Sequence, residues 1–475
     1  MITVKRDPQI ELPKIITGLM ETPRPYEGVN EYNTSGVDQT EVYGVLCPLL
    51  SLNGVVVDMP NLIRFELDCT GMLPRVEFVF RDRNNLFAQY NLPSLNNSLQ
   101  IQIIPPVDAT YHKINMTFYV TDISYSNGIV SGEGTYEVKG LLTDKAHSMG
   151  ELTTYELCDK ISVESKLGFA SNVAGTDDKR FIYCDYKDYG NLLKEEISRS
   201  AADDLHVYDC WVDMWNYIVL CDVLERYTHL DTEEEMTIWV ADHNTIGGIN
   251  DKAEPARIQC VLSNHPAMER NELFVRMYEV ITDNQYVRHG TKKSVAVYNM
   301  NTNQYMKHYV SDGDVNNVES SVSLEYGGEV YGDYDYIFSK QCRNMFLKKM
   351  KSEIIEVTLT SPIFGLSRGD QCRFVWLDND PRNKYWRETL EQNNATSTIS
   401  DIDAKDMNWL NGWVSSVKGV QDDSLYINLQ VSGQYTVLGI LADYENGNWL
   451  YKIQLVRPAS RKPKLMVDIN ANIEK

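Results

Sequence analysis

Short runs of alternating apolar and polar residues place the strongest constraint on how this chain can fold. Four such runs lie between residues 41 and about 142, and they are Ile63–Cys69, Val76–Phe80, Leu99–Ile103 and Met116–Val120. A period of two puts one face of each strand against a core and the other face in water. Turn formers such as Asn127-Gly128 separate the runs. Short strands spaced in this way predict an antiparallel β-barrel or sandwich.

A second β region lies near the C-terminus. Its alternating runs begin at Ile355, Cys372, Leu425, Tyr435 and Trp449. Asn446-Gly447 stands between the last two runs, where an Asn-Gly pair is a strong signal for a hairpin turn. An apolar stripe over Phe338–Met350 predicts a helix just before this region.

The middle of the chain has helical spacing instead. Thr153 and Glu156 fit a helix capping box, and we expect Gly168 to end that helix. A second amphipathic helix is predicted over Tyr189–Ile197. The segment Val207–Val223 is apolar and aromatic, which predicts buried strand.

Composition excludes several classes of protein. Hydrophobic residues make up 43% of the chain and charged residues 24%, which is typical of a globular protein. There is no run of about 18 apolar residues, so we predict no membrane span. The N-terminal residues lack the apolar core of a signal peptide. The 9 cysteines contain no C-x-x-C pair, so we expect reduced thiols packed as small hydrophobic side chains and synthesis in a cytoplasm.

The net charge limits the partners. With 45 basic and 67 acidic residues the chain has a formal charge of −22, which repels nucleic acid. We therefore predict no DNA-reading role, although a surface past which DNA slides without sticking is compatible with this charge.

The stretch Lys166–Ser200 raises the question of a ligand-binding loop. Its segment Gly168–Gly175 lacks the Gly-Lys-Ser/Thr ending of a P-loop, because Thr176 follows directly. The adjacent Asp177 and Asp178 would point apart on regular structure, and the loop lacks the alternating acids of an EF-hand. We therefore predict a helix end, a loop and a strand that together join two packed modules.

Other candidate sites are equally unspecific. Asp401–Asp406 has acids at positions 1, 3 and 6 of a cation loop, but Asp406 and Gly412 stand where the turn glycine and the closing glutamate are needed. The 8 histidines are isolated, and neither H-E-x-x-H nor G-x-S-x-G occurs. We predict no catalytic, cofactor-binding or metal-binding residue and no cofactor. A hidden carboxylate pair of the glycosidase type stays open, because folding alone can bring two acids together.

Three separated stretches resemble the central hub protein of contractile-tail baseplates in bacteriophages. They are Thr70–Asp82 with Leu99–Ile103, then Lys166–Asn172 with Thr176-Asp177 and Trp211–Tyr217, then Val431–Ile440 with Tyr444 and Gln454–Arg457. They are similar to the family's Gly-x-x-Pro entry to a strand, its Leu-Gly-Phe-Ala and Asp-x-x-Asn-aromatic pattern, and its closing Ser-Gly-x-Tyr hairpin. The family is related to the hub part of type VI secretion spike proteins, but we expect no appended β-prism here.

The resemblance implies a structural virion protein rather than an enzyme. Such hubs form a homotrimer in which each subunit supplies two tube modules, and the resulting pseudo-sixfold ring joins the hexameric tail tube to a central spike. The implied partners are the tail tube protein, the spike protein and other baseplate wedge proteins. Phage DNA would pass through the channel without specific binding. The implied location is the tail baseplate of a virion made in the host bacterial cytoplasm.

The predicted fold class is α+β, mainly β, with two tube-type antiparallel β-barrel domains and helical or mixed insert domains. We expect an extended N-terminal arm over residues 1–40, a first tube module over 41–148, and an α/β connecting domain that starts the second tube module over 149–250. A mixed insert over 251–335, a helix with the C-terminal β domain over 336–460, and a flexible tail over 461–475 follow. The polar segment 377–408 is expected to be an exposed insertion.

An alternative function is that of a virion-associated or secreted carbohydrate-active enzyme. The 29 tyrosines and 8 tryptophans would then supply surfaces that stack on sugars. We favour the simpler interpretation that these aromatic residues fill β-sheet cores.

Overall fold

The computed structural model divides into two compact units. Unit 1 comprises Met1–Leu230, Met277–Asp370 and Thr436–Ser460, and unit 2 comprises Asp231–Arg276, Gln371–Tyr435 and Arg461–Lys475. The residues that the structure describes are 2–12, 48–57, 59–83, 85, 97–103, 114–138, 140–200, 206–228, 236–241, 260–261, 275–282, 293–299, 304–310, 330–331, 353–359, 366–378, 426–427, 433–445 and 447–457. The predictions for the helix Phe338–Met350, for residues 379–408 and for the tail lie outside them.

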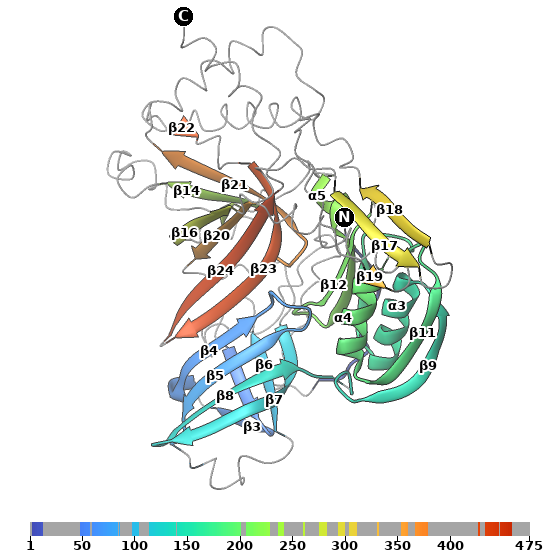
Figure 1. The fold of residues 1–475 in the computed structure, drawn as a ribbon. Helices are drawn as coiled ribbons and strands as arrows, with labels where there is room; N and C mark the ends of the chain where they lie inside the picture. The colour runs from blue at the N-terminus through green and yellow to red at the C-terminus, as the bar shows by residue number, and fades with distance from the viewer. Residues whose placement is uncertain are drawn as a thin grey trace, which may run out of the picture. The chain divides into compact units, whose positions relative to one another are not determined.

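Unit 1 contains a long, mainly antiparallel ladder (Figure 1). In spatial order its strands are β3 (Val55–Val57), β2 (Pro48–Leu52), β6 (Ser98–Ile103), β7 (Ile114–Ser126), β8 (Ile129–Tyr136), β5 (Arg75–Arg81), β4 (Leu62–Asp68), β23 (Gly433–Glu445), β24 (Asn448–Arg457), β20 (Glu353–Leu359) and β16 (Val275–Thr282). The fold is therefore α+β and mainly β, as predicted. No pairing between described strands joins β3 to the other end, so barrel closure is not found among them. Because β4 pairs with β23, both predicted β regions belong to one ladder.

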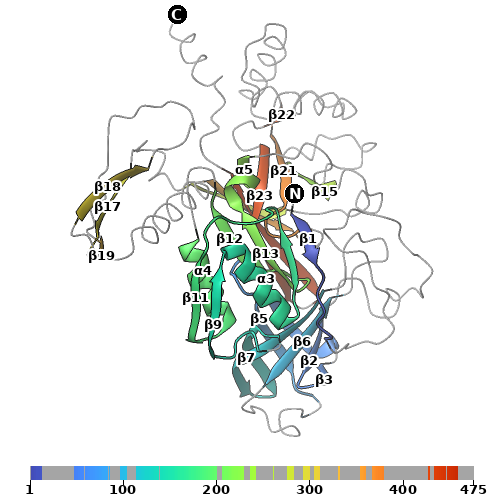
Figure 2. The same ribbon diagram turned by 90° about the vertical axis from the view of Figure 1, so that its right-hand side faces the viewer.

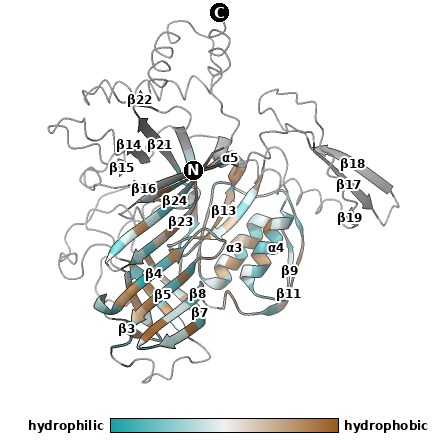
Figure 3. Cartoon of the chain, turned by 60° about the vertical axis from the view of Figure 1, so that its left-hand side comes forward, coloured by the Kyte–Doolittle hydropathy of each residue, from teal (hydrophilic) through white to brown (hydrophobic). Residues whose placement is uncertain are grey.

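The predicted alternation accounts for the core of this ladder, and Figure 3 shows its alternating hydropathy along the strands. Phe78, Ile101 and Phe118 are fully buried. In β6 the prediction of one face in water is wrong, because the polar Gln100 and Gln102 are buried as well. It is also wrong in β4, where a register shift between Leu62 and Arg64 changes the phase. Leu62 therefore enters the core in place of Ile63, which is half-buried.

Two hairpins turn where the sequence indicated. Asn127 and Gly128 both have positive φ, of 52° and 75°, which the tight turn between β7 and β8 requires. The turn between β23 and β24 contains Gly447 with φ of 92°, and Glu445 pairs with Asn448 across it.

An α/β layer makes up the middle of unit 1. Its sheet has the order β1 (Thr3–Arg6), β10 (Gly168–Ser171), β13 (Tyr217–Asp222) and β12 (Tyr208–Val212). Helix α3 (Thr154–Ser165) lies against β10 and β13, and α4 (Tyr189–Arg199) lies against β12 (Figure 2). A two-stranded ribbon of β9 (Lys145–Leu152) and β11 (Arg180–Lys187) contacts both helices. The short helix α5 (Val223–Thr228) follows β13. Most residues of β12 and β13 are buried, which confirms the buried strand predicted over most of Val207–Val223.

The first helix begins as predicted and ends differently. Thr153 and Glu156 form a reciprocal capping box at its N-terminus. The helix ends before Gly168, because Lys166 takes the left-handed conformation with φ of 56° and closes the last turn. Gly168 instead lies in β10, where a Cβ atom would stand 2.3 Å from the ring of Tyr217. This glycine is needed for a long-range contact rather than for a helix end.

The start of the predicted N-terminal arm is part of the sheet. Residues Thr3–Arg6 form β1, which pairs antiparallel with β10 of the same chain. Ile2 is buried, and the Arg6 guanidinium contacts Asp159 on α3 at 2.6 Å. The expected extended arm is therefore wrong for these residues, since they find their partners within the chain, and residues 13–47 lie outside the described part.

The remaining elements are short or belong to unit 2. In unit 2, β14 (Met236–Ala241) pairs with β15 (Cys260–Val261) and β21 (Gln371–Asp378), and β22 (Tyr426–Ile427) pairs with β21. The rings of Phe374 and Tyr435 meet edge to face there at 5.9 Å. Three further strands form a separate sheet, and they are β17 (Lys293–Asn299), β18 (Gln304–Val310) and β19 (Val330–Tyr331). A turn of 3-10 helix, η1, covers Met59–Asn61.

The cysteines behave as predicted wherever the structure describes their side chains. Six are buried and unbridged, and they are Cys69, Cys158, Cys184, Cys210, Cys221 and Cys372. Burial raises the pKa of the thiols of Cys69 and Cys221, which keeps them neutral. Among the described helices, none has the length and apolar character that a membrane crossing requires.

Candidate functional site

The three stretches that resemble hub proteins contribute to a single contact region in unit 1. We call this region the joint and define it as Thr70–Pro74, Asp213–Asn216, Arg368–Asp370 and Val437–Gly439. Three of these segments lie within or beside the resembling stretches, and Arg368–Asp370 connects them. The joint is where the first β region, the α/β layer and the C-terminal hairpin touch.

The turn after β4 forms the centre of the joint. Its first residue, Thr70, donates its backbone N–H to Asp68 Oδ1 at 2.8 Å, which fixes the turn locally. Val212 at the end of β12 donates to the Met72 carbonyl at 2.8 Å. Tyr136 at the end of β8 donates its N–H to the Pro74 carbonyl at 2.9 Å. Backbone groups of this turn thus bond to the α/β layer on one side and to the first sheet on the other.

The turn between β12 and β13 explains the Asp-x-x-Asn-aromatic pattern. Asp213 Oδ1 accepts the backbone N–H groups of Trp215 at 2.9 Å and Tyr217 at 2.8 Å. Asn216 has φ of 67°, a conformation that asparagine tolerates better than most residues. These two residues shape a turn that presents the Asn216 side chain to the first sheet.

Asn216 then bridges the two modules. The buried hydroxyl of Tyr136 donates to Asn216 Oδ1 at 2.7 Å. In return Asn216 Nδ2 donates to the Asn115 carbonyl on β7 at 3.0 Å. Burial raises the pKa of Tyr136 well above its usual value, so the phenol stays protonated and remains a donor.

Arg368 ties the third segment to the same turn. Its guanidinium donates to the carbonyls of Thr70 at 3.1 Å and Gly71 at 2.8 Å, and it pairs with Asp209 at 2.9 Å. The same group lies over the ring of Trp211, 4.7 Å from the centroid. One planar cation therefore contacts the turn after β4 and strand β12 together.

The backbone next to Arg368 pairs with β23. Gly369 donates to the Val437 carbonyl at 2.9 Å, and Val437 donates to the Asp370 carbonyl at 2.8 Å. A Cβ atom at Gly439 would stand 2.9 Å from a methyl group of Thr70, so the C-terminal hairpin and the turn approach closely. Burial raises the pKa of Asp370 to about 6, although the nearby Arg226 and the bond from the Ser367 N–H both lower it.

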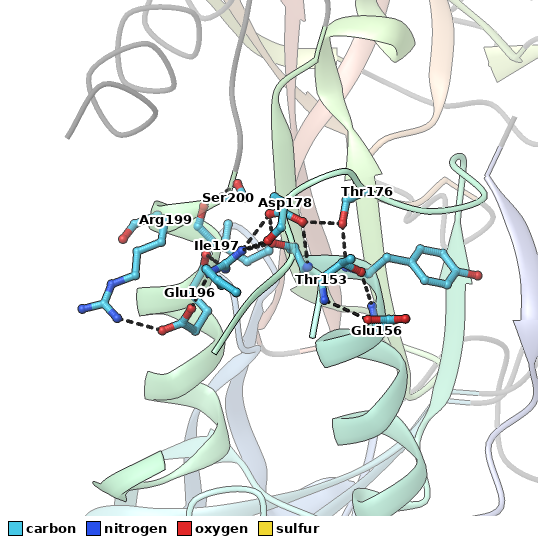
Figure 4. A network of polar contacts seen from close by, with 12 residues as sticks. Thr153, Glu156, Thr176, Asp178, Glu196, Ile197, Arg199 and Ser200 are labelled. Atoms are coloured by element: carbon cyan, nitrogen blue, oxygen red, sulfur yellow. Dashed lines mark hydrogen bonds and ion pairs between the residues drawn. The ribbon is translucent and has the colours of Figure 1, made fainter. Parts of the chain in front are cut away.

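The loop between β10 and β11, for which the sequence predicted a structural rather than a ligand-binding role, bonds to the start of α3 (Figure 4). Asp178 accepts the backbone N–H of Thr154 at 2.9 Å and the hydroxyl of Thr176 at 2.6 Å. Thr176 in turn accepts the N–H of Tyr155 at 3.0 Å. The loop thereby satisfies N–H groups at the first turn of α3 that would otherwise lack partners. Asp177 is exposed, so the two adjacent aspartates point apart as predicted.

Charged residues extend these contacts to α4. Arg180 pairs with Asp178 at 2.8 Å and with Glu196 at 3.0 Å, and Arg199 also reaches Glu196 at 3.0 Å. Burial alone would raise the pKa of Asp178, but hydrogen bonds from Thr154 and Thr176 and the charge of Arg180 lower it overall. The Asp178 carboxylate is therefore held in its ionised form by donors from the chain itself, and the loop is a structural link between α3 and α4.

A histidine–carboxylate pair was missed by the sequence reasoning. His206 Nδ1 lies 2.7 Å from Asp222 Oδ2, and Asp222 is buried while His206 is half exposed. Asp222 also accepts the Val207 N–H at 3.2 Å and the Glu225 N–H at 3.3 Å, which is the pattern of a capping carboxylate. No local signal marks this pair, because the two residues come from either end of a buried hairpin.

No metal-binding cluster of three or more histidine, cysteine or carboxylate side chains occurs within the described ranges. The candidate loop Asp401–Asp406 and residues such as His265 lie outside those ranges. The predicted absence of catalytic, cofactor and metal residues therefore stays a prediction.

No protein-family profile and no curated protein matches this sequence. The chain is similar in fold to several solved structures at low sequence identity. One is the 43 kDa tail protein of prophage MuSo2 from Shewanella oneidensis, with 10% identity, a TM-score of 0.45, and 87% of this chain and 98% of that chain covered. Another is a tail protein from Neisseria meningitidis MC58, with 9% identity, a TM-score of 0.46, and 87% and 99% covered. A third is prophage tail protein gp18 from Listeria monocytogenes, with 9% identity, a TM-score of 0.41, and 90% and 98% covered. All three of these structures are described as tail proteins.

Proposed function

We propose that this chain is a structural protein of a phage tail baseplate and serves as its hub. Three copies form a ring with pseudo-sixfold symmetry, which joins the hexameric tail tube on one side to the central spike on the other. The tail tube protein, the spike protein and other baseplate proteins are its partners, and phage DNA passes through the channel.

The observation that carries this proposal is the convergence of the three resembling stretches on the joint. The polar groups of the joint are used within the chain: Asp213 holds a turn, Asn216 bridges two modules and Arg368 binds two backbone carbonyls. A catalytic centre would instead aim such groups at a space where substrate can bind. The residues on which the resemblance rests hold the β modules of the chain together, and this supports a scaffold role.

The charge of the chain supports the channel. A wall with an excess of carboxylates repels the phosphate backbone, so DNA slides through without being held. Replacing lumen-facing aspartates and glutamates by lysine is expected to slow DNA ejection, and unchanged ejection kinetics would contradict this part of the proposal.

The native mass of the purified full-length chain tests the ring. One copy has a mass of 54.4 kDa, and we expect a species of three times that mass, either alone or when the neighbouring tail genes are co-expressed. A stable species of 54.4 kDa under both conditions would overturn the proposal.

The carbohydrate-active enzyme is the second candidate. It predicts release of soluble fragments when the purified chain is incubated with peptidoglycan or host polysaccharide. The hub proposal predicts no release by the trimeric species, and hydrolysis by a monomeric species would favour the enzyme.

A further inference from the structure

Two hairpin turns of unit 1 have the same two-residue sequence and nearly the same backbone. Asn53-Gly54 joins β2 to β3 with φ of 51° and 83°, and Asn127-Gly128 joins β7 to β8 with φ of 52° and 75°. In both hairpins the residues just before and just after the turn pair with each other. The two asparagines therefore occupy equivalent positions, and any difference in their chemistry must come from their surroundings.

An Asn-Gly pair can lose ammonia without an enzyme. The backbone nitrogen of the glycine attacks Cγ of the asparagine, and the new N–C bond closes a five-membered succinimide ring. The Cγ–Nδ2 bond breaks, and the nitrogen leaves as ammonia with the proton of the glycine N–H. Water then opens the ring at either carbonyl, which leaves aspartate or isoaspartate. Glycine hinders the attack least because it has no Cβ atom, and asparagine is accordingly a thermolabile residue.

The side chain of Asn53 is held by hydrogen bonds at both ends of its amide. Nδ2 donates to Asn97 Oδ1 at 3.0 Å, and Oδ1 accepts the backbone N–H of Ser98 at 2.8 Å. The Asn53 side chain is also half-buried at the start of β6. To present Cγ to the nitrogen of Gly54 the amide must rotate, and the rotation breaks both of these hydrogen bonds.

The side chain of Asn127 has no such restraint. It is exposed, and no hydrogen bond from the described residues reaches it. The Asp82 N–H donates to the Gly128 carbonyl at 2.7 Å, but this bond holds the peptide that follows the reacting one. The Asn127 amide is therefore free to rotate toward the nitrogen of Gly128.

The two hydrogen bonds of Asn53 set the size of the difference. Breaking one hydrogen bond of ordinary strength lowers the population of the reactive rotamer roughly fivefold, so breaking two lowers it about thirtyfold. The sequence alone does not distinguish the two pairs in this way, because each asparagine has the same successor.

We propose that Asn127 is a site of spontaneous deamidation and that Asn97 and Ser98 protect Asn53 from the same reaction. Water is the only co-reactant, and the products are ammonia and a chain with one more carboxylate. This inference does not depend on the proposed ring, because it concerns the chemistry of each single copy.

The modification changes the turn in which it occurs. In the isoaspartate product the main chain runs through Cβ, so the turn gains one backbone atom between Ser126 and Ile129, which pair across it. The Gly128 carbonyl is then displaced from the Asp82 N–H that it binds. The end of the β7–β8 hairpin, where the two strands run side by side (Figure 1), therefore loosens as the protein ages, whereas the β2–β3 turn keeps its geometry.

Peptide mass spectrometry of the full-length chain tests the assignment. The protein is incubated at mildly alkaline pH, in one series folded and in a second series in urea, and is then digested. In the folded series we expect the peptide with Asn127 to convert about thirtyfold faster than the peptide with Asn53. In urea the two should convert at similar rates. Equal rates in the folded series, or an unmodified Asn127 there while urea converts both, would overturn the proposal.

Variants at Asn97 test the protection of Asn53 directly. Asn97→Ala removes the acceptor of the Asn53 amide and should raise the conversion rate of Asn53 about fivefold in the folded protein. Asn97→Asp keeps an acceptor oxygen and should leave Asn53 slow. The rate at Asn127 in the same samples, together with circular dichroism, shows that the fold persists. An unchanged rate at Asn53 in folded Asn97→Ala would refute the protective role.

Discussion

Replacing Asn216 is expected to loosen the joint by a predictable amount. The alanine variant loses the acceptor for the Tyr136 hydroxyl and the donor to the Asn115 carbonyl, which lie at 2.7 and 3.0 Å. Each hydrogen bond contributes about 1 kcal/mol, and the Tyr136 hydroxyl, now without its acceptor, adds about 1 kcal/mol more. Alanine at φ of 67° costs a further ~1 kcal/mol. We therefore expect a loss of about 4 kcal/mol in the free energy of unfolding of unit 1.

Two companion variants separate these contributions. Asn216→Gly loses the same hydrogen bonds but relieves the backbone, so it should be about 1 kcal/mol more stable than Asn216→Ala. Tyr136→Phe removes only the hydroxyl and should cost about 1 kcal/mol. Urea denaturation followed by tryptophan fluorescence suits this region, because Trp211 precedes the turn and Trp215 lies within it. If the alanine variant loses less than about 1 kcal/mol, or if glycine is no better than alanine, the described role of Asn216 is wrong.

Three further predictions concern separate features of unit 1. Gly168→Ala should destabilise the fold by about 2 kcal/mol, because the new Cβ atom would stand 2.3 Å from the Tyr217 ring. Gly175→Ala is the control and should be neutral, because a Cβ atom there would have no neighbour within 4 Å. Equal melting temperatures of the two variants would refute the packing argument. The pKa of Asp370 is about 6 in the folded state and near 3.8 when unfolded, so the folded state holds the proton more tightly. The stability of the wild type should therefore rise relative to that of Asp370→Asn as the pH falls from 7 to 4. A constant difference between the urea midpoints of the two proteins would contradict the shift. Cys69 and Cys221 should stay unmodified by a maleimide in the folded protein and react after denaturation, as peptide mass spectrometry can show.

The local features of the fold follow from the sequence because their causes are local. Period-two runs identify strands such as β5, since alternate side chains must face the core. The capping box at Thr153 works through residues three positions apart, and the Asn127-Gly128 turn works through the φ values of its own residues. Each of these signals lies within a few positions of the structure that it predicts.

The errors and omissions have long-range causes. The phase of β4 depends on a bulge that the amino-acid sequence of the strand does not signal, so the sequence placed Ile63 in the core where the structure has Leu62. Gly168 is required by Tyr217, which lies far along the chain, and not by the helix that precedes it. Arg368 contacts Thr70 from 298 positions away, so no spacing pattern could have marked it as a member of the joint. The resembling stretches indicated which segments matter, but only the structure shows that they meet.

Electron microscopy of the purified assembly tests the central claim most directly. Class averages viewed down the symmetry axis should show a ring of three subunits with six similar β modules around an open channel. Averages that show isolated subunits, or an assembly without threefold symmetry and without a channel, would contradict the account.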